Sequence, residues 1–410
     1  MLWDHRPYRL QQVYCHRIFL KLGLCLAIFL SLLTTASEAQ EARSPEQIVT
    51  GFNGRVEQFF RAESGQPLVR SKIREPLGPG RGNFARHYSY SIVAFAARCL
   101  YLGEMLEEAN AALAENAKHY LNNPLDINDR DSFHWHADIT MRLIEMYGSN
   151  GSEHPGRIKK ETEELALRPI WLYVKKSSSL AKAEYKNSKT WRLYSSENHH
   201  TMDFTVNWHF AKLAKDRPAY RNLKCDDGAT LAEHYDAWNN YFVAYCVERA
   251  KKSPCVEMMS DHYNSALIKG FYNFYDFGDP RTKRAAGMLL DLFWAYWAQE
   301  QMGGIQGGGR SRISFHEALQ ANVEHGATSL AWLYFDIGEQ PTVYGHDMNA
   351  ALSTYCPPAV VADIAVDVSG RGRYEVRQRP QGLGKNTRFQ GTKVTDLRTD
   401  GGGILRYSYC

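Results

Sequence analysis

The sequence lacks several short motifs that identify common enzyme classes. It contains no CxxC pair, so we expect no structural zinc site of that kind. It contains neither the GxSxG of α/β-hydrolases nor the HExxH of zinc proteases. The glycine run 307–309 is not followed by GK[ST] and does not follow a predicted strand, which excludes a phosphate-binding loop. We therefore expect no metal and no cofactor.

An excess of charge of one sign is also missing. The chain has 49 Lys and Arg against 45 Asp and Glu. Four of the basic and two of the acidic residues lie in Met1–Ala39, so 45 and 43 remain beyond it. This near balance argues against nucleic acid as a partner. Recognition of a polyanion would have to depend on a local cluster of charge.

Only one long hydrophobic run occurs. Leu22–Leu33 is apolar apart from Gly23 and Ser31, follows four basic residues and precedes several small ones. This pattern predicts a secretory signal peptide over residues 1–39, with a retained anchor as the alternative. We expect a secreted or periplasmic protein with no membrane association after cleavage.

Cysteines are few beyond that segment: Cys99, Cys225, Cys246, Cys255, Cys356 and Cys410. Export permits disulfides, and Cys246–Cys255 or Cys225–Cys255 are possible pairs. Buried free thiols are the equal alternative.

From Phe84 onwards the apolar spacing predicts helix after helix, joined by short loops. The predicted helical stretches are Tyr88–Asn122, a helix ended by Gly148, Glu161–Lys175, Leu180–Tyr185, Leu231–Ala250, Tyr263–Phe277, a helix from Asp279-Pro280 to Gly303-Gly304, and Phe315–Ile337. This order indicates stacked helical hairpins in a toroid or a bundle, over residues 40–355. After Cys356 the alternation in Arg373–Arg377 and Ile404–Tyr409 predicts strands, and residues 356–410 form a β-rich segment that is possibly truncated.

The segment Trp191–His209 concentrates polar chemistry at a predicted helix start. Ser195 and Ser196 suit an N-cap, and Glu197, Asn198, His199 and His200 share the first turn. Capping alone explains an Asn-His pair in many helices, and Glu197 there suits the helix dipole. Asp203 lies four residues after His199, where it can orient the imidazole.

Three other places carry site-like residues. They are Asp261–Asn264 before a predicted helix, Gly307–Arg312 after one, and His134-Trp135-His136. β-Elimination from a uronate requires a group that neutralises the carboxylate, a base for the C5 proton and an acid for the leaving oxygen. Asn or Arg suits the first role, and His or Tyr suits the other two.

A metal site on His134 and His136 is not expected, because the two side chains diverge on a helix.

Three stretches, SENHH, YNFYDFGDPRTKRAAGMLLDL and GGGRSR, resemble the (α/α)-toroid polysaccharide lyases, a group that includes alginate and glucuronan lyases. The resemblance implies that Asn198 neutralises the carboxylate, that His199 is base or co-neutraliser, and that Tyr263 is acid and possibly base. Arg310 or Arg312 would bind the anionic polysaccharide. Further substrate contacts are assigned to His200, Glu197, Trp191 and His262.

The chain departs from the group at one place. A Tyr is expected shortly after the basic pair, and Ile313–His316 stands there instead. Tyr194, Tyr235 and Tyr263 therefore all remain eligible as the acid.

Two other functions fit the same residues. The first is an inverting glycosidase with Glu197 as general acid and Asp203 or Asp236 as general base. The second is a glycan-binding protein without catalysis.

Overall fold

The computed structural model describes residues 43–69, 88–128, 133–194, 196–252, 254–255, 261–306, 327–343, 345–367 and 369–370, with five short strands beyond them. The predicted signal peptide, the glycine run with Arg310 and Arg312, and Cys410 lie outside these residues. Of the unit Met1–Ser44, only Arg43 and Ser44 are described, and the rest of this section concerns Pro45–Cys410.

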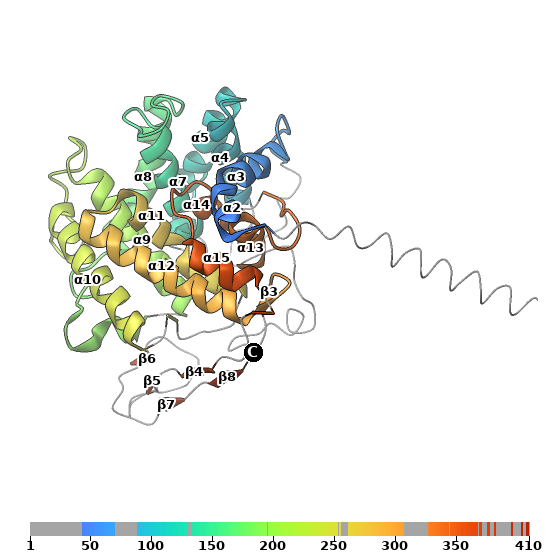
Figure 1. The fold of residues 1–410 in the computed structure, drawn as a ribbon. Helices are drawn as coiled ribbons and strands as arrows, with labels where there is room; N and C mark the ends of the chain where they lie inside the picture. Colours follow the sequence, from blue (N-terminus) through green and yellow to red (C-terminus); the bar gives the residue numbers. More distant parts are fainter. Residues whose placement is uncertain are drawn as a thin grey trace, which may run out of the picture. The chain divides into compact units, whose positions relative to one another are not determined.

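The described part is mainly α-helical, as predicted, and its helices pack against each other (Figure 1). The α-helices of six or more residues are α2 (Pro45–Thr50), α3 (Phe52–Arg61), α4 (Ser89–Leu102), α5 (Leu106–Asn122), α7 (Phe133–Tyr147), α8 (Lys160–Ser177), α9 (Glu197–Ala214), α10 (Leu231–Lys252), α11 (Asp261–Phe277), α12 (Pro280–Glu300), α13 (Ala327–Phe335) and α15 (Ala359–Val366). The other helical segments are the four-residue α-helices α6 (Pro124–Ile127) and α14 (Met348–Ala351) and the 3₁₀ helices η3 (Lys186–Trp191) and η4 (Gly345–Asp347).

Helix α12 shows how local sequence sets these boundaries. Its N-cap is Asp279, whose carboxylate accepts the backbone N–H of Thr282 at 2.7 Å, and Pro280 occupies the first turn. The predicted start is confirmed. The helix ends at Glu300, two residues before the predicted stop, because Gly303 and Gly304 adopt positive φ and turn a small hairpin between β2 (Gln301–Met302) and β3 (Ile305–Gln306).

Two other predicted helices need correction, and a third is described only in part. Residues 88–122 form two helices, because Gly103 ends α4 with a left-handed conformation. Residues 180–185 form a turn, in which the backbone N–H of Leu180 is held by Asp227 at 2.8 Å. Of the predicted helix Phe315–Ile337, only Ala327–Phe335 is described as helix.

The C-terminal segment begins with a helix and not with a strand. Residues Ala359–Val366 form α15, whose Val361, Ala362 and Ala365 are buried and which packs against α12 and α2. The short strands are β1 (Arg192–Leu193), β4 (Glu375–Arg377), β5 (Gln381–Gly382), β6 (Thr395–Asp396), β7 (Gly403–Ile404) and β8 (Tyr407–Tyr409). They pair antiparallel and two by two, as β1 with β6, β4 with β8, and β5 with β7.

Helices α9 and α11 run in the same direction. Thr205 of α9 lies against Gly270 of α11, where an added Cβ would come within 2.4 Å of the Thr205 side chain. Three residues further along α9, the ring of Trp208 lies 4.1 Å from that of Phe274. Later residues of one helix thus meet later residues of the other, so both helices begin at the same end.

Helix α7 runs in this direction too, while α10 runs in the opposite one. His134 of α7 meets His199 of α9, and further along Glu145 meets Lys212. On α10 the order reverses, since Trp208 bonds to Asn239 whereas the earlier residue His200 bonds to Tyr241. The first turns of α7, α9 and α11 therefore lie at one end of the helix layer.

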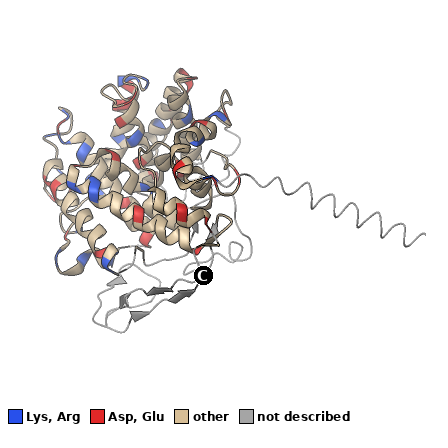
Figure 2. Cartoon of the chain, viewed as in Figure 1, with Lys and Arg blue, Asp and Glu red and all other residues tan. Residues whose placement is uncertain are grey.

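Charges of both signs are interspersed over the described helices (Figure 2). None of these helices combines the length and apolarity needed to cross a bilayer. The five described cysteines, Cys99, Cys225, Cys246, Cys255 and Cys356, are free thiols, so neither proposed disulfide is formed here.

Candidate functional site

The first turn of α9 places the buried Asn198 and the half-buried His199 at the end of the layer where the helices begin. Ser196 is the N-cap residue by backbone conformation, and its hydroxyl donates to Oδ1 of Asn198 at 2.7 Å rather than capping a backbone N–H. This bond fixes the Asn198 amide with its oxygen towards Ser196 and its NH₂ group on the other side. A helix N-terminus and an amide donor together favour an anionic ligand.

His199 is half-buried and held by another imidazole. Its Nδ1 lies 3.0 Å from Nε2 of His134, which is in the first turn of α7. Burial, and after it the charges of His199, Lys269 and His136, lower the pKa of His134 well below its ordinary value. His134 is therefore neutral, and it serves as a hydrogen-bond partner that carries no charge of its own.

An aromatic ring lies beside this imidazole pair. Trp135 is half-buried, with its ring 5.9 Å from that of His199 and stacked at 5.8 Å on Tyr90 of α4. The buried Lys269 of α11 donates to the backbone oxygen of Trp135 and, at 3.3 Å, to the hydroxyl of Tyr90. These bonds fix the backbone of Trp135 and the Tyr90 side chain on which its ring stacks.

Tyr263 lies in the first turn of α11 and is half-buried. Where α9 packs on α11, Gly270 lies against Thr205 and is 65 positions later in the sequence. Tyr263 is likewise 65 positions after Asn198. Because the two helices are parallel, this register places Tyr263 level with Asn198. Three of the residues chosen from the sequence thus lie in the first turns of two neighbouring parallel helices.

The other eligible tyrosines lie elsewhere. Tyr235 of α10 lies under the ammonium group of Lys215, 5.5 Å from its ring centroid, beyond the far end of α9. Sixteen residues of helix separate Lys215 from His199, which is about 24 Å at 1.5 Å per residue. Tyr194 stacks on His200 at 5.9 Å. Tyr235 therefore lies far from Asn198, and Tyr194 packs on the neighbouring His200.

His200 points into the core and not along the site. Its Nε2 lies 2.8 Å from the hydroxyl of Tyr241, and its Nδ1 accepts the backbone N–H of Tyr194 at 3.4 Å. Burial, and after it the charges of Arg249 and Lys182, lower the pKa of His200 to about 3. This environment favours a structural role for the neutral ring.

Glu197 and Trp191 belong to a second buried cluster. Arg249 of α10 lies 3.3 Å from Glu197, and both side chains are fully buried. The guanidinium lies between two rings, 3.7 Å from the centroid of Trp191 and 4.0 Å from that of Tyr245. The ion pair explains Glu197 without a substrate.

The carboxylates of the glycosidase hypothesis are not arranged as a pair. Glu197 is bound to Arg249, Asp203 accepts the hydroxyl of Tyr173 at 2.7 Å, and Asp236 is exposed on α10. Hydrolysis with inversion needs two carboxyl groups facing each other across the substrate. This geometry does not favour that reaction.

We compared the chain with protein-family models, curated proteins and solved structures. None of the three comparisons gives a match.

Arg310 and Arg312 lie outside the described residues, and of His262 only the backbone is described, in the first turn of α11. Their roles stay predictions. Sequence reasoning missed the contact of His134 with His199, because nothing local marks a contact between residues 65 positions apart. The HWH pattern was the only signal that pointed to this position.

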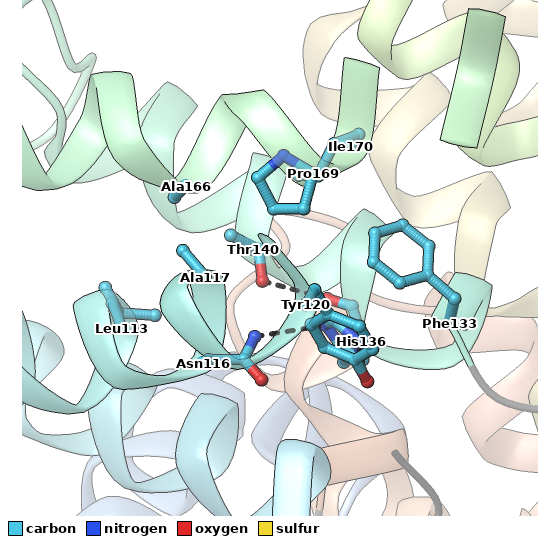
Figure 3. A pocket seen from close by; sticks show the side chains of 10 residues that line it. All are labelled: Leu113, Asn116, Ala117, Tyr120, Phe133, His136, Thr140, Ala166, Pro169 and Ile170. Atoms are coloured by element: carbon cyan, nitrogen blue, oxygen red, sulfur yellow. Dashed lines mark hydrogen bonds between the residues drawn. The ribbon is translucent and has the colours of Figure 1, made fainter. Parts of the chain in front are cut away.

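A small pocket lies between α5, α7 and α8 (Figure 3). It is lined by Leu113, Asn116, Ala117, Tyr120, Phe133, His136, Thr140, Ala166, Pro169 and Ile170. His136 lies 3.0 Å from the hydroxyl of Tyr120 and 3.5 Å from Nδ2 of Asn116. Burial lowers the pKa of His136 to about 3, so this imidazole is a neutral member of the core.

Proposed function

We propose that the protein is a polysaccharide lyase that cleaves a uronic-acid-containing polysaccharide by β-elimination. The observation that carries this proposal is the arrangement of Asn198 and His199 at the start of α9, with Tyr263 level with them on α11. An amide donor, an imidazole and a phenol are the three kinds of group that the reaction needs.

The roles follow from the chemistry of each group. The NH₂ group of Asn198 and the helix N-terminus stabilise the negative charge that builds up on the uronate carboxylate. His199 removes the C5 proton, and the electrons of that C–H bond form the C4–C5 double bond. As the C4–O bond breaks, Tyr263 protonates the leaving oxygen. The half-buried Trp135, whose ring lies 5.9 Å from that of His199, is the proposed stacking partner of a neighbouring sugar ring.

We further propose that the helices form an (α/α) toroid. The order of neighbours supports this, because α4 contacts α7, α7 contacts α9, α9 contacts α11, α11 contacts α13, α13 contacts α3, and α3 contacts α4. The helices α5, α8, α10, α12 and α15 each contact members of this series. A uronic-acid polymer outside the cell is the corresponding substrate, and Arg310 and Arg312 are its proposed carboxylate contacts.

The test is an ultraviolet absorbance assay for unsaturated uronate ends. The mature protein is incubated with alginate, polymannuronate, polyguluronate, glucuronan, and heparan- and chondroitin-type chains. A rise in absorbance with one polymer supports the proposal and identifies the substrate. New reducing ends without absorbance would instead show hydrolysis, and binding without either product would show a glycan-binding protein.

Variants then connect the reaction to the site. We expect His199→Ala and Asn198→Ala each to lower kcat by about 100-fold or more, as loss of a general base or of a charge-stabilising donor does. The matched control is His154→Ala, because His154 is exposed. All three variants should keep the helical circular dichroism. Full activity in His199→Ala would refute its assigned role.

A further inference from the structure

A chain of hydrogen bonds leads from His199 into the interior. Nδ1 of His199 lies 3.0 Å from Nε2 of His134, and Nδ1 of His134 lies 3.4 Å from the hydroxyl of Tyr173 on α8. That hydroxyl donates to Oδ1 of Asp203 at 2.7 Å, and Nδ2 of Asn207 approaches the same oxygen at 3.5 Å. His134 and Tyr173 are buried. This series of hydrogen bonds thus begins at His199 and ends at Asp203, one turn further along the same helix, α9.

The direction of each bond follows from the proton count. An ionised carboxylate only accepts, so Asp203 takes the one proton of the Tyr173 hydroxyl. The hydroxyl oxygen is then the acceptor for His134, which must carry its proton on Nδ1. A neutral imidazole has a single N–H, so Nε2 of His134 accepts. His199 must therefore donate from its own Nδ1.

We propose that Asp203, Tyr173 and His134 are positioning residues that hold neutral His199 in its Nδ1–H tautomer. Nε2 of His199 then carries the lone pair. The tautomer is a property of the resting protein. That Nε2 is the atom that removes the C5 proton rests on the proposed function.

This arrangement gives the base a defined direction. In a free imidazole the proton exchanges between the two nitrogens, so that only part of the population presents a lone pair at a given nitrogen. Here the carboxylate sets the proton positions through two neutral groups, without placing its own charge next to His199. Asp203 follows His199 by four residues on the same helix, but it acts through α8 and α7.

The tautomer can be read directly by nitrogen NMR of the full chain labelled with ¹⁵N-histidine. The His199 signals are assigned by their loss in His199→Gln. At neutral pH we expect the Nδ1 shift of a protonated nitrogen and the Nε2 shift of an unprotonated one. A His199 with its proton on Nε2 would overturn the proposal, whether or not any polymer is cleaved.

The relay itself is tested by Tyr173→Phe, which keeps the ring and removes the acceptor of the His134 proton. We expect the His199 shifts to move towards a mixture of tautomers. Once a polymer that the protein cleaves is known, kcat of this variant should fall about two- to tenfold at constant KM. The reason is that only part of the protein then has His199 in the tautomer that can remove the proton. The control is Tyr220→Phe, another buried tyrosine, which packs on Phe210 and Trp171.

The outcomes separate the two proposals. Unchanged His199 shifts in Tyr173→Phe would refute the relay, even if activity falls, because such a fall would reflect packing alone. Absence of lyase activity in the wild type together with the expected tautomer would refute the proposed function and leave the relay standing.

Discussion

Acidification should destabilise this protein, because several imidazoles are buried in their neutral form. Burial is the largest cause that lowers the pKa of His136 and of His200 to about 3 each. In the unfolded chain a histidine has its ordinary pKa of about 6.5. Between these values the unfolded chain binds protons that the folded chain excludes. The free energy of unfolding is therefore highest above about pH 6.5 and falls as the pH drops towards about 3.

The magnitude follows from the linkage relation. Each such histidine lowers the free energy of unfolding by about 1.4 kcal/mol per pH unit once the unfolded form is protonated. From about pH 7 to about pH 5 the loss is about 2 kcal/mol per histidine, or about 4 kcal/mol for His136 and His200 together. Domains are stable by only about 5–15 kcal/mol, so this loss is large.

The assay is urea unfolding followed by circular dichroism at a series of pH values. His200→Gln removes one titrating group and keeps a side chain that can bond to the hydroxyl of Tyr241. We expect its pH slope to be lower than that of the wild type by about one proton between pH 6 and 4. His154→Gln, at an exposed position, should keep the wild-type slope. An unchanged slope in His200→Gln would refute the reasoning.

Two further predictions concern stability. Glu197→Gln leaves the buried guanidinium of Arg249 without its anion and should lower the free energy of unfolding by about 3–5 kcal/mol; a loss below 1 kcal/mol in urea unfolding would show that the pair is not needed. Gly270→Ala places a methyl group against Thr205 and should cost about 1–3 kcal/mol, whereas Gly54→Ala, with open space around it, should be neutral or stabilising. Equal melting temperatures of the two alanine variants would contradict the close packing of α9 on α11.

Local signals predicted helix starts well. Asp279-Pro280 begins α12, and Ser196 precedes the first residue of α9. The same local signals predicted helix ends less well, and they did not predict the helix Ala359–Val366. Gly303 and Gly304 fit a helix stop and a hairpin turn equally, and the φ angles that distinguish the two cannot be read from a glycine pair. The apolar residues of Ala359–Val366 show their helical face only when α12 and α2 lie against them.

The helix starts that carry the chosen residues were predictable from the sequence, and the contacts of those residues were not. Asn198, His199 and Tyr263 could be chosen because each chemistry stands at an expected helix start. The partner of His199 could not be chosen, since a His–His contact between α7 and α9 depends on how the helices pack. For the same reason the sequence around Glu197 could not predict its ion pair with Arg249, which lies 52 residues later on an antiparallel helix.

The ion pair between Glu197 and Arg249 has a consequence for ligand binding. Glu197 immediately precedes Asn198, so the turn that carries Asn198 and His199 is anchored in the core by a buried charge contact. Moving this turn would expose or separate two desolvated charges, which is costly. Asn198 and His199 should therefore keep their geometry when the site is empty, and little entropy is lost in ordering them when a ligand arrives. This turn is then the rigid part of the candidate site.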